Sequence, residues 1–295
     1  MKVGVVINQH TAAGRDEAIA KEIRTAFAQQ GIEAQVRLSP SKHLAATTTH
    51  LLEEKVDTLV AGGGDGTVST IAEICARHRL PLGLLPLGTR NHFGRDLGIP
   101  RSTAECVLCI SHGHTCKVDL GSANNRLFIN NSSIGAYPRA VEQREELRSR
   151  FQLRKHVAGM IATLSTFARR PLVDATIELD GSTLRSTGPF VFIGNNVYSL
   201  RLFSVNHRAS LTEGKLCVYT AHCNGIPGLL HLLWLSLWGR IEQSRHFDMR
   251  TGVEAVIRLP KREVRVSKDG EVLRMKTPLH YRILPRALEV FAPAA

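Results

Sequence analysis

The chain has 295 residues, of which 43% are apolar and 22% are charged. This length and composition suit one or two globular domains and exclude an intrinsically disordered chain. The N-terminal stretch KVGVVIN is too short for the apolar part of a signal sequence, so we expect a cytoplasmic protein. Six unevenly spaced cysteines predict reduced thiols rather than a disulfide framework.

The positive charge is concentrated in the second half of the chain. Residues 1–125 carry 13 Lys+Arg and 12 Asp+Glu, whereas residues 126–295 carry 25 and 14. Such an excess attracts anionic lipid, nucleic acid or an acidic ligand. The charge alone does not choose among these partners.

Strands and helices alternate along the first 85 residues. Apolar patterns predict strands over 2–8, 35–38, 56–60 and 81–85, and helices over 16–30, 42–54 and from 68 onward. This alternation is typical of a parallel, doubly wound sheet with helices on both faces. A further helix is expected over 102–111.

The strand over 56–60 leads into GGGDGT at 62–67 and then into a helical pattern. Glycines at such a turn let phosphate oxygens approach the N–H groups at the positive end of the helix. The Asp65 carboxylate would repel a phosphate, so we expect it to act through Mg²⁺ or by accepting a proton. The alternative is a tight turn with Asp65 as the helix N-cap. The spacing matches neither a Walker loop nor the dinucleotide fingerprint.

A second glycine-punctuated loop, PLGTRNHFGR at 86–95, follows the strand over 81–85. In a parallel sheet both loops leave the carboxyl edge. We therefore expect Thr89 and Asn91 to converge with Asp65 on one ligand.

Several metal-ligating side chains lie close together at Cys106, Cys109, His112, His114 and Cys116. They allow a zinc hypothesis. Cys106 lies among apolar residues, however, and no second CxxC or HxxxH completes a structural site. We favour the interpretation that these thiols are small buried side chains.

After Gly121 the pattern changes to short strands separated by turns. We expect strands over 127–130, 175–179, 190–193, 215–220, 255–259, 264–267 and 281–284. These strands predict a β-rich, sandwich-like domain over 125–295, following an α/β domain over 1–124. The last strand is a candidate to return to the first domain.

Two segments of the second half differ from this pattern. A helical stretch over 139–169 carries Arg148, Arg150 and Arg154, and is either a solvated face or a membrane-surface helix. The run LLHLLWLSLW at 229–238 has about half the length of a membrane span, so burial is favoured over an interfacial position. We expect peripheral association with anionic membranes that salt weakens.

The motifs, taken in order, resemble the diacylglycerol kinase catalytic family. They are GGGDGT, PLGTRNHFGRDLGIP, KVDLG, RLFINNSSIG, LTEGKL and KDGE, and the resemblance to the bacterial soluble lipid kinases extends over essentially the whole chain. These kinases are related to sphingosine kinases and, more distantly, to NAD kinases. The resemblance implies a nucleotide-binding α/β domain, a β-sandwich-like domain and an active site in the cleft between them.

The resemblance also implies roles for individual residues. Asp65 and Glu271 would be catalytic, with Glu271 accepting the proton of the lipid hydroxyl and Mg²⁺ bound to the phosphates of ATP. A structural Mg²⁺ site is implied at Glu213 with the backbone carbonyls of Ser210 and Lys215. The implied ATP-binding positions are Asn8, Ser39, Gly63, Gly64, Asp65, Gly66, Thr67, Val68, Ser69, Thr70 and Thr89.

The chain departs from the family pattern at several positions. Its first loop, at 8–14, reads NQHTAAG where the family usually has Asn-Pro. His92 stands where many relatives have Asp, so Asp96 or Asp269 would have to supply that charge. Glu213 replaces an Asp, which would leave the structural Mg²⁺ site looser or empty. From the residues alone, Asp269-Gly270 is a hairpin turn.

We predict an ATP-dependent lipid kinase that phosphorylates diacylglycerol or a related lipid. The alternatives are a kinase of a soluble ligand, as in NAD kinases, and a phosphate- or nucleic-acid-binding protein without catalysis. A soluble substrate gives no reason for the apolar segment over 229–238, and no nucleic-acid-binding motif accompanies the charge. The expected partners are ATP and a lipid at an anionic membrane surface, with no nucleic acid; a homodimer is left open.

Overall fold

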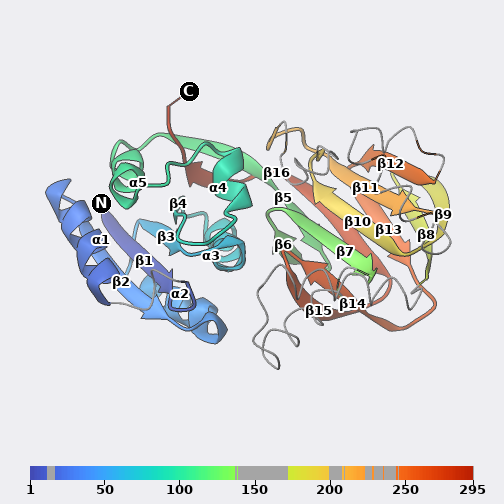
Figure 1. Ribbon diagram of the computed structural model, residues 1–295, viewed down its shortest axis with the longest axis horizontal. Coiled ribbons are helices and arrows are strands. Elements are labelled where there is room, and N and C mark those ends of the chain that lie inside the picture. Colours follow the sequence, from blue (N-terminus) through green and yellow to red (C-terminus); the bar gives the residue numbers. More distant parts are fainter. Residues whose placement is uncertain are drawn as a thin grey trace. The chain divides into compact units, whose positions relative to one another are not determined.

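A computed structural model of the chain describes residues 1–11, 17–136, 138, 172–198, 208, 210–222, 228, 235, 244 and 246–294. They form two compact units: unit 1 is Met1–Leu120 with Pro285–Ala295, and unit 2 is Gly121–Leu284 (Figure 1). The helical expectations over 139–169 and 229–238 lie outside the described residues, apart from Leu235. No helix of the described part is long and apolar enough to cross a bilayer.

Unit 1 contains a parallel sheet. Its strands β2 (Glu33–Ser39), β1 (Lys2–Asn8), β3 (Thr58–Gly62) and β4 (Leu82–Leu85) lie in that order, and β16 (Leu279–Phe291) continues the sheet beside β4. The strand order reverses between β1 and β3. In such sheets ligands bind beyond the carboxyl ends of the strands at the reversal.

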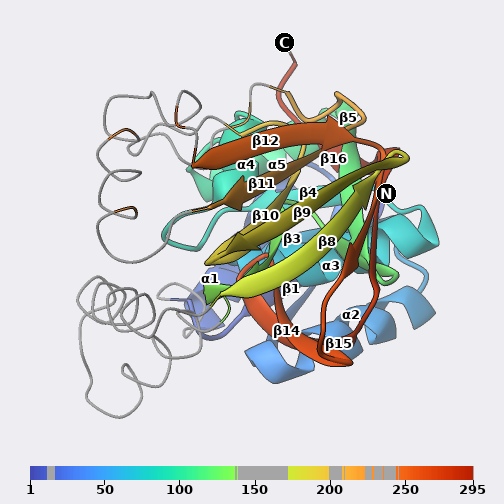
Figure 2. The same cartoon turned by 90° about the vertical axis from the view of Figure 1, so that its right-hand side faces the viewer.

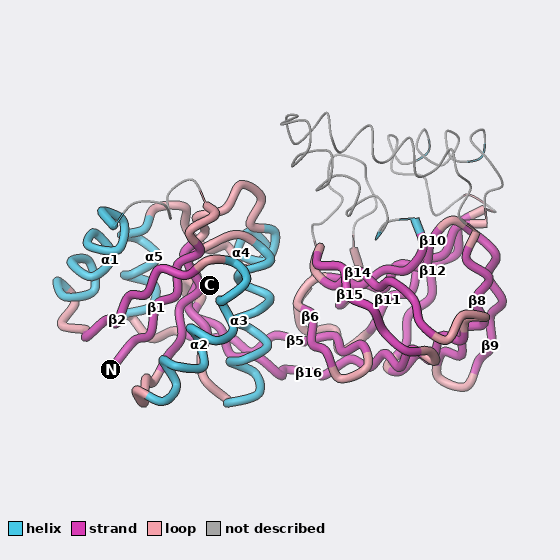
Figure 3. Tube along the Cα trace, turned by 90° about the horizontal axis from the view of Figure 1, so that it is seen from below, coloured by secondary structure: helices cyan, strands magenta, loops and turns pink. Residues whose placement is uncertain are grey.

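Helices cover both faces of this sheet, as the alternating pattern predicts (Figure 3). They are α1 (Glu17–Gln29), α2 (Leu44–Glu53), α3 (Asp65–His78), α4 (His92–Asp96) and α5 (Thr103–Ser111), with a 3-10 turn at Ser41–His43. The apolar side chains of α1 recur every three or four residues, and Ile23 and Phe27 pack with Ile110 of α5 against Val5 of β1. Helices α2 and α3 contact each other on the opposite face.

Unit 2 is a sandwich of two sheets, which confirms the β-rich second domain (Figures 1 and 2). One sheet has the order β12 (Phe247–Gly252), β11 (Leu216–Ala221), β10 (Phe190–Asn195), β7 (Asn131–Gly135), β14 (Glu263–Lys268) and β15 (Glu271–Lys276). The other contains β9 (Ser182–Gly188), β8 (Val173–Leu179), β13 (Glu254–Arg258) and β16; β5 (Thr115–Ala123) pairs with β16 and with β6 (Arg126–Phe128). Side chains of both sheets form one apolar core that includes Ile177, Val218, Ile257 and Val266.

The cysteines of the zinc hypothesis do not form a metal site. Cys106 is buried on α5, where its Sγ donates to the carbonyl of Pro100 over 3.1 Å, and burial raises the pKa of its thiol to about 12. Within the described ranges, no group of three or more His, Cys, Asp or Glu side chains could hold a metal ion. The buried-thiol interpretation therefore holds for Cys106.

Candidate functional site

The carboxyl ends of the parallel strands bring the predicted residues of unit 1 together. Asn8 at the end of β1 pairs in register with Ser39 at the end of β2, and Ile7 pairs with Gly62 at the end of β3. The Nδ2 of Asn8 donates to Thr67 Oγ1 over 2.9 Å, which links the first strand to the glycine turn. Residues far apart in the sequence thus meet at one edge of the sheet.

The turn between β3 and α3 presents the uncapped N-terminus of a helix. Helix α3 begins at Asp65 with Gly64 as its N-cap, and no side-chain hydrogen bond caps it, so the alternative of Asp65 as N-cap is wrong. The first N–H groups of a helix have no intrahelical partner, which leaves those of Asp65, Gly66 and Thr67 for an anion. A Cβ added to Gly66 would meet no atom within 4 Å, so the space beside it is open. The turn therefore fits a phosphate group.

The second loop packs its backbone against the first. The N–H of Gly88 donates to the Gly63 carbonyl over 3.2 Å, and that of Gly63 donates to the Leu85 carbonyl over 3.1 Å. A Cβ on Gly88 would overlap the Cα of Gly64, so this approach requires a glycine. Thr89 follows directly and is exposed, beside the point where the two loops touch.

Several predicted residues are buried or hydrogen-bonded within unit 1. Val68 and Ser69 are buried on α3, and the Thr70 hydroxyl donates to the Gly66 carbonyl over 3.0 Å. Ser39 is also buried, with its Oγ 2.8 Å from Thr47 Oγ1. Thr70 therefore bonds the backbone of the turn directly, whereas Ser39 bonds helix α2.

That Asn91 converges on the ligand with Asp65 stays a prediction, and its buried Oδ1 has no hydrogen-bond partner among the described residues. Its Nδ2 donates to the carbonyls of Pro86 and Gly88 over 2.9 and 2.7 Å. The amide therefore closes its own loop. Asn91 also has a positive φ of 48°, which an Asn tolerates better than most residues.

The Asp65 carboxylate is only loosely engaged. Its Oδ1 lies 3.4 Å from the N–H of Phe93, a long hydrogen bond. Burial is the main cause that lowers the pKa of the neighbouring His92, and the charge of Asp65 opposes this shift. Within the described residues the Asp65 carboxylate forms no ion pair, so it can accept a metal ion held by phosphates.

In unit 2, Asp269-Gly270 forms the hairpin turn between β14 and β15. Both residues have positive φ, 48° and 86°, as a two-residue hairpin of this kind requires. The Asp269 carboxylate accepts the N–H groups of Ile129, Asn130 and Asn131 over 2.9, 2.8 and 3.1 Å. Asp269 therefore fastens the segment before β7, and it is not the free carboxylate that the sequence suggested for replacing a missing charge.

Glu271 begins β15 directly after this turn. It pairs in register with Lys268, whose buried Nζ donates to the Leu127 carbonyl over 3.0 Å. Glu271 itself is exposed, and no described residue gives its carboxylate a hydrogen bond or ion pair. The hairpin thus presents a free carboxylate on a fixed backbone.

The residues predicted to hold a structural Mg²⁺ lie in the loop before β11. Glu213 is exposed, the Ser210 Oγ lies 3.3 Å from Thr212 Oγ1, and the Lys215 carbonyl accepts the N–H of Asn196 over 2.9 Å. Mg²⁺ demands a near-octahedral set of oxygen ligands. One exposed carboxylate beside an engaged carbonyl is a poor fit, and this site stays a prediction.

Unit 2 contains two buried hydroxyls that no local sequence pattern reveals. Ser133 on β7 and Ser267 on β14 lie opposite each other in register, and each is 1% exposed. Neither hydroxyl has a hydrogen-bond partner within the described part of the chain. Phe192 lies on the other side of Ser133, and its ring packs edge-on against Tyr219. A buried unpaired hydroxyl costs free energy unless a ligand or water completes it; only the strand register reveals this pair.

Known proteins share both units. Residues 2–123 match the diacylglycerol kinase catalytic domain, and residues 131–292 match the YegS C-terminal NAD kinase beta sandwich-like domain. The diacylglycerol kinase of Staphylococcus aureus (strain JH9) is 29% identical over 246 residues, which are 82% of this chain and 76% of that protein.

Solved structures share the fold over the whole chain. A candidate diacylglycerol kinase of Bacillus anthracis str. Sterne has a TM-score of 0.78 at 23% identity and covers 99% of this chain and 95% of its own. A diacylglycerol kinase structure from the same strain has a TM-score of 0.68 at 19% identity, with 99% and 97% covered. Since the two domain models also account for nearly all of the sequence, the chain belongs to the diacylglycerol kinase family.

Proposed function

We propose that this protein is an ATP-dependent lipid kinase that transfers the γ-phosphate of ATP to a hydroxyl of diacylglycerol or a related lipid. The observation that carries the proposal is the uncapped N-terminus of α3, with the loosely held carboxylate of Asp65 in its first turn. An anion site beside one carboxylate suits a polyphosphate that brings Mg²⁺ with it. Family membership and the relatives named diacylglycerol kinase support the same conclusion.

Each proposed role follows from the exposure and the hydrogen bonds of the group concerned. The N–H groups at the start of α3 bind phosphate oxygens, and Asp65 would hold the cation. Mg²⁺, when bound, neutralises charge on the phosphates. The exposed carboxylate of Glu271 takes the proton of the lipid hydroxyl as its oxygen attacks the γ-phosphorus, and ADP leaves.

The paired hydroxyls of unit 2 are proposed contacts for the polar part of the lipid. Ser133 and Ser267 offer two donors side by side, next to the apolar ring of Phe192. Ester or glycerol oxygens would satisfy hydroxyls that no described residue satisfies. An amphiphile matches Ser133, Ser267 and Phe192 because polar and apolar side chains lie next to each other on one face of the sheet.

A transfer assay with γ-labelled ATP, Mg²⁺ and a panel of lipids in mixed micelles tests the proposal. We expect label in the lipid extract for diacylglycerol or a related lipid. Anionic micelles should raise the rate and added salt should lower it, because residues 126–295 carry 25 Lys+Arg against 14 Asp+Glu. Label in NAD would instead indicate a kinase of a soluble ligand, and no transfer to any acceptor would indicate a binding protein.

Gly88→Ala is expected to weaken ATP binding by about tenfold or more, measured by calorimetry. The added Cβ overlaps the backbone of Gly64, so the two loops must separate and the phosphate site must change shape. Gly94→Ala is the matched control, because a Cβ there would meet its nearest neighbour at 3.8 Å. Equal ATP affinity in both variants would show that the contact between the loops does not shape the site.

A further inference from the structure

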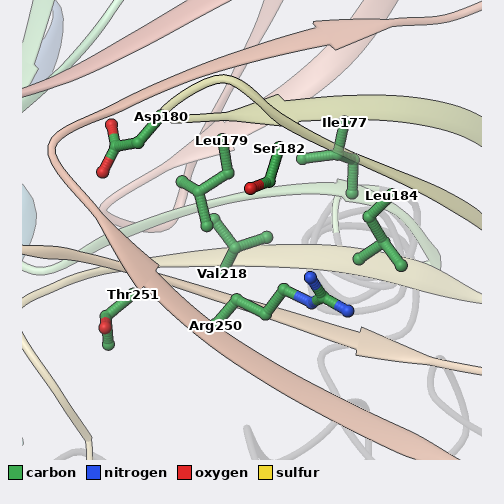
Figure 4. Close-up of a pocket in the computed structure, with 8 residues that line it drawn as sticks. All are labelled: Ile177, Leu179, Asp180, Ser182, Leu184, Val218, Arg250 and Thr251. Atoms are coloured by element: carbon green, nitrogen blue, oxygen red, sulfur yellow. The ribbon is translucent and has the colours of Figure 1, made fainter.

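Unit 2 contains a slot between its two sheets, near one edge of the sandwich. Its volume is about 340 Å³. The β8–β9 hairpin lines it on one side and strands β11 and β12 on the other, with Ile177, Leu179, Asp180, Ser182, Leu184, Val218, Arg250 and Thr251 (Figure 4). Protein interiors keep few voids larger than a water molecule, and ligand pockets begin at about 300 Å³. The slot is therefore large enough for a small ligand.

Two glycines bring the sheets into contact on either side of the slot. A Cβ on Gly188, at the end of β9, would overlap the carbonyl oxygen of Ala221 at the end of β11. A Cβ on Gly252, at the end of β12, would lie 2.5 Å from Leu179 Cδ1. The sheets are therefore close at both places, and the slot is the space that remains between them.

Half of the residues that line the slot are apolar. Ile177 and Val218 are 1% and 2% exposed and belong to the core of the sandwich, and Leu184 packs beside them. These three side chains offer neither donors nor acceptors to a ligand. The interior of the slot therefore suits a hydrocarbon chain.

The rim carries a cation without a partner. Arg250 lies opposite Val218 in register, and no described residue forms a hydrogen bond or ion pair with it. Figure 4 shows its guanidinium at the Leu184 end of the slot, with the Asp180 carboxylate at the other end. That carboxylate is occupied, because it accepts the N–H groups of Val253 and Glu254. The slot therefore carries an anion and a cation at opposite ends, and the Arg250 end is the one that suits an anionic head group.

We propose that the slot binds a single-chain anionic amphiphile, with its hydrocarbon chain between the sheets and its carboxylate or phosphate head at Arg250. A guanidinium donates paired hydrogen bonds to either head group. The hydroxyl of Ser182, also on the slot, supplies a further donor. None of the lining residues belongs to the proposed phosphoryl-transfer site, so this inference stands independently of the kinase proposal.

Calorimetry with the full chain tests the proposal, using decanoate and decyl phosphate below their micelle-forming concentrations. We expect at least one of them to bind, and the stronger of the two identifies a fatty acid or a lipid phosphate as the natural source. Arg250→Gln should weaken that binding by about tenfold or more. Arg185→Gln is the matched control, since this exposed arginine of β9 lies outside the slot and its loss removes the same charge.

A second variant tests the apolar part of the slot. Leu184→Phe should fill it and weaken binding by at least about tenfold, with thermal unfolding showing that the variant is folded. The proposal is overturned if neither amphiphile binds, or if decanol or inorganic phosphate binds as tightly as the amphiphile. Equal weakening by Arg250→Gln and Arg185→Gln would also overturn it, because general attraction to a basic protein would then explain the binding.

Discussion

Asp65→Asn is expected to lower kcat by roughly 10³-fold or more, because metal-assisted charge stabilisation contributes several kcal/mol and each 1.36 kcal/mol is tenfold. The fold should survive, since the carboxylate makes only a long hydrogen bond of 3.4 Å and the amide has the same shape. The free energy of unfolding should change by less than about 0.5 kcal/mol. Transfer of label from ATP and chemical unfolding measure the two quantities.

The same chemical change at Asp57 is the control for this variant. Asp57 accepts the N–H of Lys2 over 2.8 Å at an exposed position of unit 1, away from the glycine turn. Asp57→Asn should therefore keep wild-type turnover. Wild-type turnover in Asp65→Asn would show that the glycine turn is not part of the catalytic site.

Glu271→Gln should lower kcat by about 10²–10⁴-fold, the usual contribution of a general base. Glutamine keeps the shape of the side chain and loses its basicity. The KM for ATP should barely change, because the role assigned to Glu271 is to take a proton and not to bind nucleotide. Glu263→Gln, on the facing strand of the same hairpin, is the matched control and should remain active. Full kcat with a raised KM for ATP would make Glu271 a nucleotide or metal ligand instead.

Asp269→Asn separates structural from catalytic loss in this hairpin. Its carboxylate accepts three backbone N–H groups, and hydrogen bonds to a charged group are worth about 1.5–3 kcal/mol each. We expect the free energy of unfolding to fall by about 2–4 kcal/mol, because the amide retains only part of this acceptor capacity. Added Mg²⁺ should not restore the free energy of unfolding. A stable variant whose activity returns with Mg²⁺ would show that Asp269 is a metal ligand.

The fold could be predicted where burial is reflected in the local pattern. Every residue of β11 is buried, and its sequence LCVYTA reads as a strand. The hydrophobic pattern does not predict β9, β12 and β15. These strands lie at sheet edges and carry many polar residues, as in STLRSTG and FDMRTG. The strand expected over 281–284 runs on to Phe291 as β16, past Pro285, a residue that normally argues against a continuing strand.

The residues of the candidate site could likewise be predicted only where the sequence signal is local. The glycine turn is local, so Asp65 and its neighbours could be found from the sequence. The role of Asp269 depends on hydrogen bonds to a segment 138–140 residues away, which no local pattern contains. The pairing of Ser133 with Ser267 likewise needs the register of β7 and β14. The hydrogen bonds of Asn91 to its own loop depend on the backbone conformation of that loop, which the sequence pattern does not specify.

The shared strand β16 bears on the order in which the protein can fold during synthesis. Unit 1 includes Pro285–Ala295, and Phe291 packs in the same core as Val5 and Phe27. Domains generally fold from the N-terminus as the ribosome releases them. Here unit 1 lacks the strand beside β4 until residues 285–291 have emerged, whereas Gly121–Leu284 is complete before that point. The nascent unit 1 must therefore wait, with part of its core exposed, for residues 285–291 to be translated.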